Sequence, residues 1–358
     1  SHTLVYGVLG QGGDVKLMTG VRKFQRDTIY QTDQYVEVLH RALRSNYPGI
    51  VLAPQQKALA PEEPYRLIPP QEYQANIVRN IKQSHYLSCI TGIPSLRIPG
   101  SPDDFFSQSI DRLVDALRGE DYLLLVLAEP ILDNRLSANI AVLRGLSGEV
   151  HNLVSQSISL YRNRSESDQT SRSKSQTYSV GAGQILSAIF GISVGMTTTT
   201  SEGTSITEGT GASVAQETLD KTAQFCEQVL EHYIQRLQVG RSLGFWNVGI
   251  YLASNNFNTH MRSQAIVRSL YSGMETYFEP IRVIDLTDAP AGVRHTIAHL
   301  EIPVLTHLGS NTDHPLGEEY QSLGTPLTTN ELSLLFSFPR REVPGLKMKR
   351  VADFNLNP

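Results

Sequence analysis

A stretch rich in serine, threonine and glycine, residues 165–213, constrains the fold of this chain more than any other feature. It lies between two long segments with helical periodicity, residues 132–164 and 215–239. A segment with so few large apolar side chains contributes little to a hydrophobic core. We therefore expect it to be an insertion between two paired helices, and not a linker between two domains.

The insertion has a period of two in places. Small hydroxyl residues alternate with larger ones over residues 171–180. Over residues 186–196 the apolar residues share one parity, and the four at the end of this run are our candidate assembly residues: Phe190, Ile192, Val194 and Met196. Such alternation is typical of β-strands with one apolar face. Three interpretations stay open: a disordered segment, a projecting β-hairpin that joins a barrel in an oligomer, and a hairpin that inserts into a membrane.

The remaining sequence indicates an α+β fold. The apolar run at residues 123–127 predicts a strand that is covered on both faces. A helix that leads through a glycine turn into such a strand occurs twice, over residues 110–128 and 233–253. We expect one mixed sheet flanked by long helices. Its two halves would be residues 1–164 and 214–325, followed by a connector at 326–358.

Other elements follow from local signals. Strands are expected at residues 4–9, 15–21, 86–91, 245–253 and 281–286, and helices at 32–45, 102–118, 258–277 and 328–336. Thr32 and Asp33 are the predicted cap of the first helix. A proline-rich loop is expected at residues 54–70.

Composition limits the class of protein. Of 358 residues, 40 % are hydrophobic and 18 % are charged, as in ordinary globular proteins. The net charge of -4 argues against coating nucleic acid through bulk charge. Cys89 and Cys226 are the two cysteines, so a disulfide framework is not expected. The first residues lack a secretory signal. Together these features predict a cytoplasmic protein.

The sequence shows no catalytic motif in a supporting context. A P-loop, Gly-x-x-x-x-Gly-Lys-Ser/Thr, does not occur. The glycines of residues 7–13 predict a hairpin turn, because strand signals follow them instead of a helix. The spacing Gly-x-Ser-x-Gly occurs at residues 191–195, within the serine-rich insertion and without a strand-to-helix elbow. Acidic pairs at 103–104 and 318–319 are expected at loops or helix starts.

Four histidines gather late in the chain: His295, His299, His307 and His314. The first two are four residues apart, a spacing that places metal ligands on one helix face. The metalloprotease motif is incomplete, since no glutamate follows His295. We expect surface or hydrogen-bonded histidines and no bound metal.

Several short stretches resemble one family. They are residues 91–95 (TGIPS), 110–117 (IDRLVDAL), 127–130 (LAEP), 327–332 (LTTNEL) and 338–345 (FPRREVPG). Together with the serine-rich insertion between long helices, these stretches resemble the N-terminal region of HerA/VirB4-type ATPases, which are FtsK-like P-loop translocases.

The resemblance implies a non-catalytic domain that assembles hexameric rings, docks a partner protein or guides DNA into a motor. Arg340, Arg341 and Glu342 are its candidate interaction residues. No cofactor is expected in this chain, whereas ATP and magnesium would bind a core that follows Pro358. Contact with a membrane is not expected. The alternative is a stand-alone structural or membrane-active module that oligomerises through the serine-rich segment.

Overall fold

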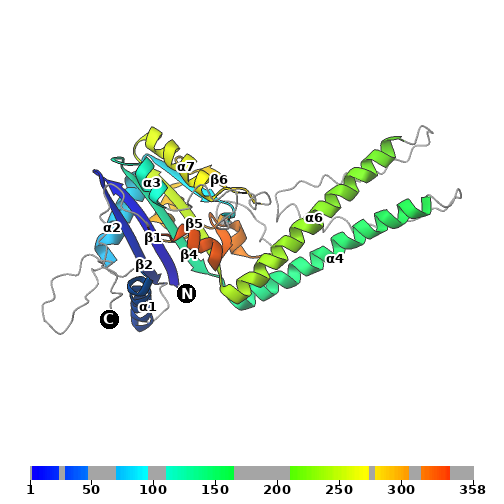
Figure 1. Cartoon of the computed structure of the whole chain (residues 1–358), viewed down its shortest axis with the longest axis horizontal. Coiled ribbons are helices and arrows are strands. Elements are labelled where there is room, and N and C mark those ends of the chain that lie inside the picture. Colours follow the sequence, from blue (N-terminus) through cyan, green and yellow to red (C-terminus); the bar gives the residue numbers. More distant parts are fainter. Residues whose placement is uncertain are drawn as a thin grey trace, which may run out of the picture. The chain divides into compact units, whose positions relative to one another are not determined.

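The computed structural model describes residues 2–23, 29–46, 70–95, 110–164, 210–273, 279–305 and 316–338. The chain forms two compact units. Unit 1 comprises Ser1–Pro130, Phe245–His307 and Ser322–Pro358, and unit 2 comprises Ile131–Gly244 and Leu308–Gln321. A β-sheet organises unit 1, whereas a long pair of helices organises unit 2 (Figure 1).

The sheet of unit 1 has seven strands in the order β2-β1-β4-β5-β3-β6, with β7 paired to β5. The strands are β1 (His2–Gln11), β2 (Asp14–Lys23), β3 (Tyr86–Thr91), β4 (Tyr122–Pro130), β5 (Phe245–Ser254), β6 (Arg282–Asp285) and β7 (Thr325–Thr328). The predicted α+β class is confirmed. The sheet was expected to be mixed, but every described pairing is antiparallel.

The central pair of strands explains this difference. β4 and β5 are neighbours from Tyr122 opposite Ser254 to Pro130 opposite Trp246. The chain leaves the sheet after β4 and returns to the same end of the sheet at β5, so the two strands run in opposite directions. The prediction that both halves of the sequence build one sheet is confirmed.

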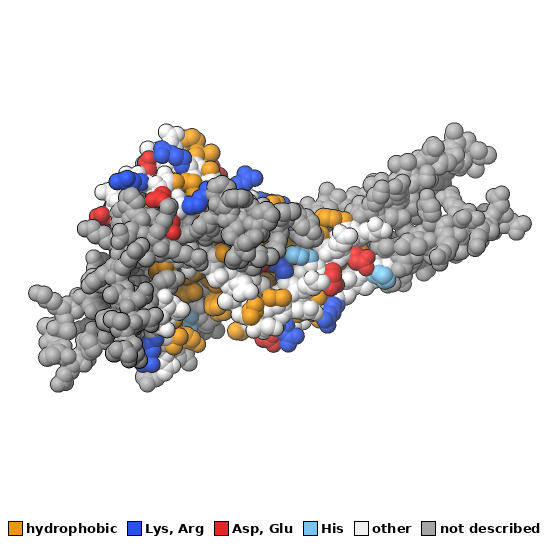
Figure 2. All heavy atoms as spheres, in the orientation of Figure 1, with side chains coloured by type: hydrophobic (Ala, Val, Ile, Leu, Met, Phe, Trp, Pro, Cys, Tyr) orange, Lys and Arg blue, Asp and Glu red, His pale blue; other side chains and the backbone are white. Residues whose placement is uncertain are grey.

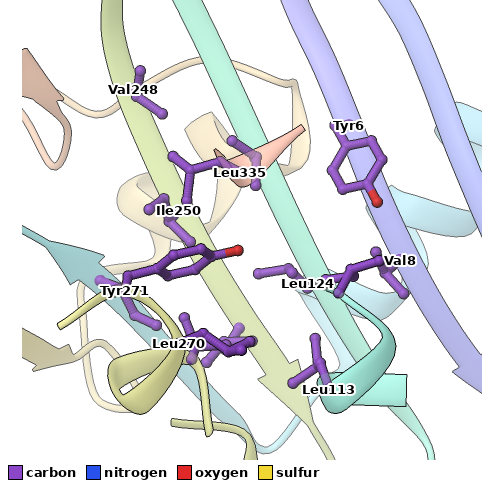
Figure 3. Packing of buried hydrophobic residues seen from close by; sticks show 14 of the residues in the cluster. Tyr6, Val8, Leu113, Leu124, Val248, Ile250, Leu270, Tyr271 and Leu335 are labelled. Carbon is purple, nitrogen blue, oxygen red and sulfur yellow. The ribbon is translucent and has the colours of Figure 1, made fainter. Parts of the chain in front are cut away.

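Helices cover both faces of the sheet. On one face, Tyr6, Leu124 and Ile250 belong to a core that three helices complete (Figure 3). These helices are α3 (Asp111–Ala116), α7 (Phe257–Tyr271) and α9 (Thr329–Leu335). On the opposite face, α2 (Pro70–Gln83) and α8 (Ala291–Ala298) pack on the neighbouring parity of the strands. The run at residues 123–127 supplies side chains to both cores, as its continuous apolarity predicted.

Turns and caps at the strand ends follow the local sequence. Gly12 and Gly13 join β1 to β2 with φ of 60° and 92°, values that glycine adopts without strain. This confirms the predicted hairpin turn. At the start of α9, Thr328 and Glu331 form a reciprocal capping box. The helix predicted at 328–336 therefore begins where its sequence indicates.

Unit 2 contains two long helices, α4 (Asp133–Arg164) and α6 (Thr210–Leu243), which lie side by side and antiparallel. A short 3₁₀ turn, η3 (Glu318–Gln321), belongs to the same unit. α4 has 32 residues, which corresponds to a length of ~48 Å. The expected pairing of the two helices is confirmed, and we call the pair the helical hairpin. None of the described helices has the combined length and apolarity that crossing a bilayer requires.

Several predicted boundaries were wrong. α1 (Ile29–Asn46) begins before Thr32 and Asp33, so these residues lie inside the helix and do not cap it. On this helix Leu43 is buried, while Tyr35 is exposed. The helix expected at 258–277 is described only as far as Tyr271. α2, α8 and β7 were not predicted.

Candidate assembly surface on the helical hairpin

The helical hairpin is held together along a single seam. On α4 the buried side chains include Leu136, Leu143 and Val150, which recur at intervals of seven residues. The matching positions on α6 are Cys226, Tyr233 and Gly240, of which the two side-chain-bearing residues are buried. A seven-residue spacing is that of coiled-coil packing, in which side chains of one helix enter gaps on the other. Each helix therefore contacts its neighbour along one narrow stripe.

An arginine–aspartate ion pair and a histidine–glutamate hydrogen bond join the helices. Arg241 Nε lies 2.9 Å from Asp133 Oδ1 near one end of the pair. Farther along, His151 Nδ1 lies 2.9 Å from Glu227 Oε1. These contacts show which levels of the two antiparallel helices face each other. They also define one side of the hairpin, which we call the ion-paired flank.

The opposite side follows from helix geometry. Each residue advances about 100° around a helix, so the residues before and after a seam position lie on opposite flanks. Glu227 follows the seam residue Cys226 and lies on the ion-paired flank. Phe225, which precedes Cys226, therefore lies on the other flank. Val239 lies there too, because it precedes Gly240.

This second flank carries exposed apolar residues on both helices. In an antiparallel pair, equivalent positions on the two helices face the same side, so Val142, which precedes Leu143, joins Phe225 and Val239. Leu243 lies one turn beyond Val239. Their exposed fractions are 37 % for Val142, 44 % for Phe225, 46 % for Val239 and 48 % for Leu243. We call these four residues the apolar flank. Figure 2 shows apolar side chains exposed among polar ones along the described part of the hairpin.

An apolar row of this kind is unusual for a water-facing helix pair. Isolated exposed apolar residues are normal on protein surfaces, but aligned ones mark sites of interaction. Leu132, just before α4, is also exposed. Sequence periodicity cannot separate a seam residue such as Cys226 from its immediate neighbour Phe225. Val142 and Leu243 were missed entirely.

Unit 1 contains a buried cluster with catalytic residue types. Gln264 Nε2 donates a hydrogen bond of 2.7 Å to Ser88 Oγ, which lies 2.5 Å from His260 Nε2. Burial lowers the pKa of His260, and the nearby Asp285 partly opposes this shift. A catalytic triad requires a carboxylate on the other ring nitrogen. His260 Nδ1 has no hydrogen-bond partner among the described residues.

The geometry of this cluster indicates a structural role. Ser88 and His260 are both buried, so a substrate has no direct access to them. Asp285 accepts a hydrogen bond from the Thr287 backbone instead of orienting the imidazole. The cluster joins α7 to β3 through polar contacts beneath the surface. It resembles a buried structural network, in which one ring nitrogen of His260 is left without a described partner, more than a nucleophile with its base.

A second polar group lies across the opposite face of the sheet. Burial raises the pKa of the Glu129 carboxyl, while a backbone hydrogen bond at Ile302 and the Arg22 guanidinium act in the other direction. Arg22 also forms an ion pair with Glu301. These contacts connect β2 and β4 to the segment that follows α8. They supply no group of three metal-ligating side chains.

The structure brings only part of the histidine group together. The rings of His295 and His299 stack with centroids 4.0 Å apart at the end of α8. His299 Nδ1 is within 2.7 Å of the His295 carbonyl oxygen. His307 and His314 lie outside the described residues. Among the described residues, no group of three or more histidine, cysteine or acidic side chains is placed to hold a metal ion.

The candidate residues named from the sequence also lie outside the described part of the chain. They are Phe190, Ile192, Val194, Met196, Arg340, Arg341 and Glu342. The structure therefore neither joins nor separates them. The candidate surface that the structure itself provides is the apolar flank. Its member nearest in sequence to the serine-rich insertion is Phe225.

No protein-family model, curated protein or solved structure matches the chain. The apolar flank and the buried clusters must therefore be judged by their geometry alone.

Proposed function

We propose that this chain is a non-catalytic assembly domain of a HerA/VirB4-like ring ATPase that translocates DNA or protein, and that its apolar flank binds a second copy of the chain. The family assignment is taken from the sequence resemblance. The single observation that supports an assembly role is the apolar flank, whose four residues are exposed in line along two helices.

The two flanks of the hairpin differ in a way that favours contact with another protein. The ion-paired flank carries the contacts Asp133–Arg241 and His151–Glu227 between the two helices. The four exposed side chains of the apolar flank gain free energy when they are covered. At ~25 cal/mol per Å², covering the exposed part of each side chain contributes about 1 kcal/mol.

This magnitude sets the expected strength of the contact. Bringing two chains together costs about 4–15 kcal/mol in lost freedom. The flank alone therefore predicts weak, concentration-dependent self-association. In a larger assembly, this contact would act together with contacts made by other surfaces of the chain.

Sedimentation velocity on the full chain over a wide concentration range tests this proposal. We expect the wild-type sedimentation coefficient to rise with concentration. Val239→Lys should abolish the rise, because it places a charge within the apolar flank. Gln238→Lys is the matched control: this exposed neighbour lies away from the flank, and its variant should behave as the wild type does.

Phe225→Lys and its exposed neighbour Gln224→Lys form a second matched pair at the other end of the flank. Circular dichroism on all four variants checks that the helices are retained. A wild-type chain that stays monomeric at every concentration would contradict the assembly role. So would equal effects of the flank and neighbour variants.

The ATPase part of the proposal needs a separate test. We expect the gene to encode a Gly-x-x-x-x-Gly-Lys-Ser/Thr sequence after the codon for Pro358. Sequencing the reading frame at that point decides between a motor protein and another context for the same assembly domain.

A further inference from the structure

Two charged residues of α4 lie on the same side of the hairpin as the apolar flank, and their order along the helix limits how two copies can pack. Arg135 and Glu149 precede the seam residues Leu136 and Val150, so both lie on the same side as Val142. Half of the Arg135 side chain is exposed, and Glu149 is exposed. Val142 lies seven residues from each charge. The opposite charges are thus placed symmetrically about Val142, ~21 Å apart along the helix.

On α6, two large apolar residues are placed near the two ends of the flank, on either side of the level of Val142. Leu243 lies close to the level of Asp133, because its neighbour Arg241 pairs with that aspartate. Phe225 lies close to the level of His151, because its neighbour Glu227 pairs with that histidine. The level of Val142 is midway between these two ends. Each end of the flank therefore combines one charge from α4 with one large apolar side chain from α6.

We infer that two copies of the hairpin pack flank to flank and antiparallel, around a two-fold axis at Val142, to form a four-helix bundle. This inference rests on the proposed self-association. It places Arg135 opposite Glu149 of the second copy and Leu243 opposite Phe225 of the second copy. Val142 meets its own counterpart on the axis. A self-complementary surface of this type is what a two-fold dimer requires.

The other two-fold arrangement fits the same surface poorly. If the hairpins ran parallel, α4 of one copy would lie over α6 of the other at the same level. Glu149 would then face Phe225, and Arg135 would face Leu243. Each charge would lose water without gaining a partner, which costs free energy. Charge and apolarity together therefore select the antiparallel arrangement.

An existing contact of Arg135 is compatible with this packing. Its Nη2 lies 3.7 Å from Glu319 Oε2 within the same unit, a long contact for an ion pair. A guanidinium has five donors, so one arginine can bind two carboxylates. Arg135 can thus keep Glu319 while it contacts Glu149 of the second copy.

A cysteine cross-link tests the axis directly. The chain's own cysteines, Cys89 and Cys226, are buried. Val142→Cys should form a covalent dimer under mild oxidation or with a short bismaleimide, because the two sulfurs meet at the axis. Val239→Cys is the control: it lies on the flank but away from the axis, where its counterpart is ~15 Å distant. It should remain uncross-linked.

Charge exchange tests the pairing. Arg135→Glu and Glu149→Arg should each weaken self-association about tenfold, since each creates two like-charge contacts per dimer. The double variant Arg135→Glu/Glu149→Arg should restore the wild-type association. Sedimentation velocity at low ionic strength measures all three, because salt screens such contacts.

The outcomes separate the two proposals. A chain that never self-associates overturns both. A chain that does self-associate, but cross-links at residue 239 and not at 142, overturns only the antiparallel two-fold. Failure of the double charge variant to recover association overturns the two-fold in the same way. Cross-linking at 142 together with recovery supports it.

Discussion

The sheet of unit 1 and the helical hairpin of unit 2 bury apolar residues in different ways. In the sheet, helices cover both faces, so adjacent residues such as Leu124 and Leu125 are both buried. In the hairpin, the side chains that face the other helix are buried, whereas apolar residues beside them such as Val142 and Phe225 are exposed. The sheet thus uses its apolar sequence for its own stability. The hairpin has apolar residues beyond those that its seam uses, and these are available to a partner.

Matched truncations of two fully buried leucines should show this difference most strongly. Leu125→Ala removes a side chain enclosed between the sheet and its helices, and we expect a loss of about 3–5 kcal/mol in the free energy of unfolding. Leu143→Ala in the seam should cost less, because two helices can move together and alanine favours the helix. Urea unfolding followed by circular dichroism measures both. Equal losses would mean that the two units unfold as one, and would contradict the difference in burial between the sheet and the hairpin.

A second prediction concerns Arg294, which connects helices on one face of the sheet. Its Nη1 donates to the carbonyl oxygens of Ser84 (2.9 Å) and Ile81 (3.2 Å) at the end of α2. Its Nη2 donates to the carbonyl oxygen of Thr287 (3.0 Å). Arg294→Met leaves these acceptors without the cation that favours a helix C-terminus, and should cost about 2–4 kcal/mol.

Arg294→Lys is the control for Arg294→Met. It keeps the charge but has a single donor group, so thermal denaturation should place it between the methionine variant and the wild type. A methionine variant that melts at the wild-type temperature would show that water can replace the arginine as the donor to these carbonyl groups without loss of stability.

A smaller effect is expected from pH in unit 1. Burial lowers the pKa of His260 in the folded chain, so the unfolded chain binds a proton more readily. Stability from the neutral imidazole is present above the ordinary histidine pKa of about 6.5 and is lost as pH falls below it. Urea midpoints at pH 7.5 and 5.5 should therefore differ more in the wild type than in His260→Gln. A His260→Gln variant with unchanged pH dependence would assign the effect to other groups.

The sequence predicted the sheet better than the helices around it, and the reason is physical. A run such as residues 123–127, with Gly119 before it and Pro130 after it, favours a short strand covered on both faces. α2 buries only Ile77 and Ile81 among its described side chains, so its periodic signal was weak. β7 contains four residues including Pro326, which counts against a strand in isolation.

The candidate surface was harder to predict than the fold. Phe225 and Cys226 are adjacent and both apolar, and periodicity alone assigns both to a core. Only the position of the second helix separates the buried residue from the exposed one. The ion pairs that define the flanks join residues 76 and 108 positions apart in the chain, which no local pattern reveals. Surface function thus depends on tertiary pairing, whereas strand burial does not.

The smallest predicted effect separates the stability of the hairpin from its capacity to associate. Gly145 lies on the exposed side of α4, and a Cβ added there meets no atom within 4 Å. Gly145→Ala should stabilise the helix by about 0.5–1 kcal/mol, because alanine loses less backbone freedom than glycine on folding. Hydrogen exchange of α4 amides measures this gain, and Gly148→Ala, which is equally open, should reproduce it.

Neither glycine belongs to the apolar flank, so self-association in sedimentation should not change in these two variants. If a more stable hairpin associated more tightly, the strength of self-association would be limited by fraying of the helices rather than by the side chains of the apolar flank. The surface would then be formed only when the helices are fully ordered, and a partner could control assembly by ordering them. An unchanged association constant, in contrast, would assign assembly to the side chains of Val142, Phe225, Val239 and Leu243 themselves.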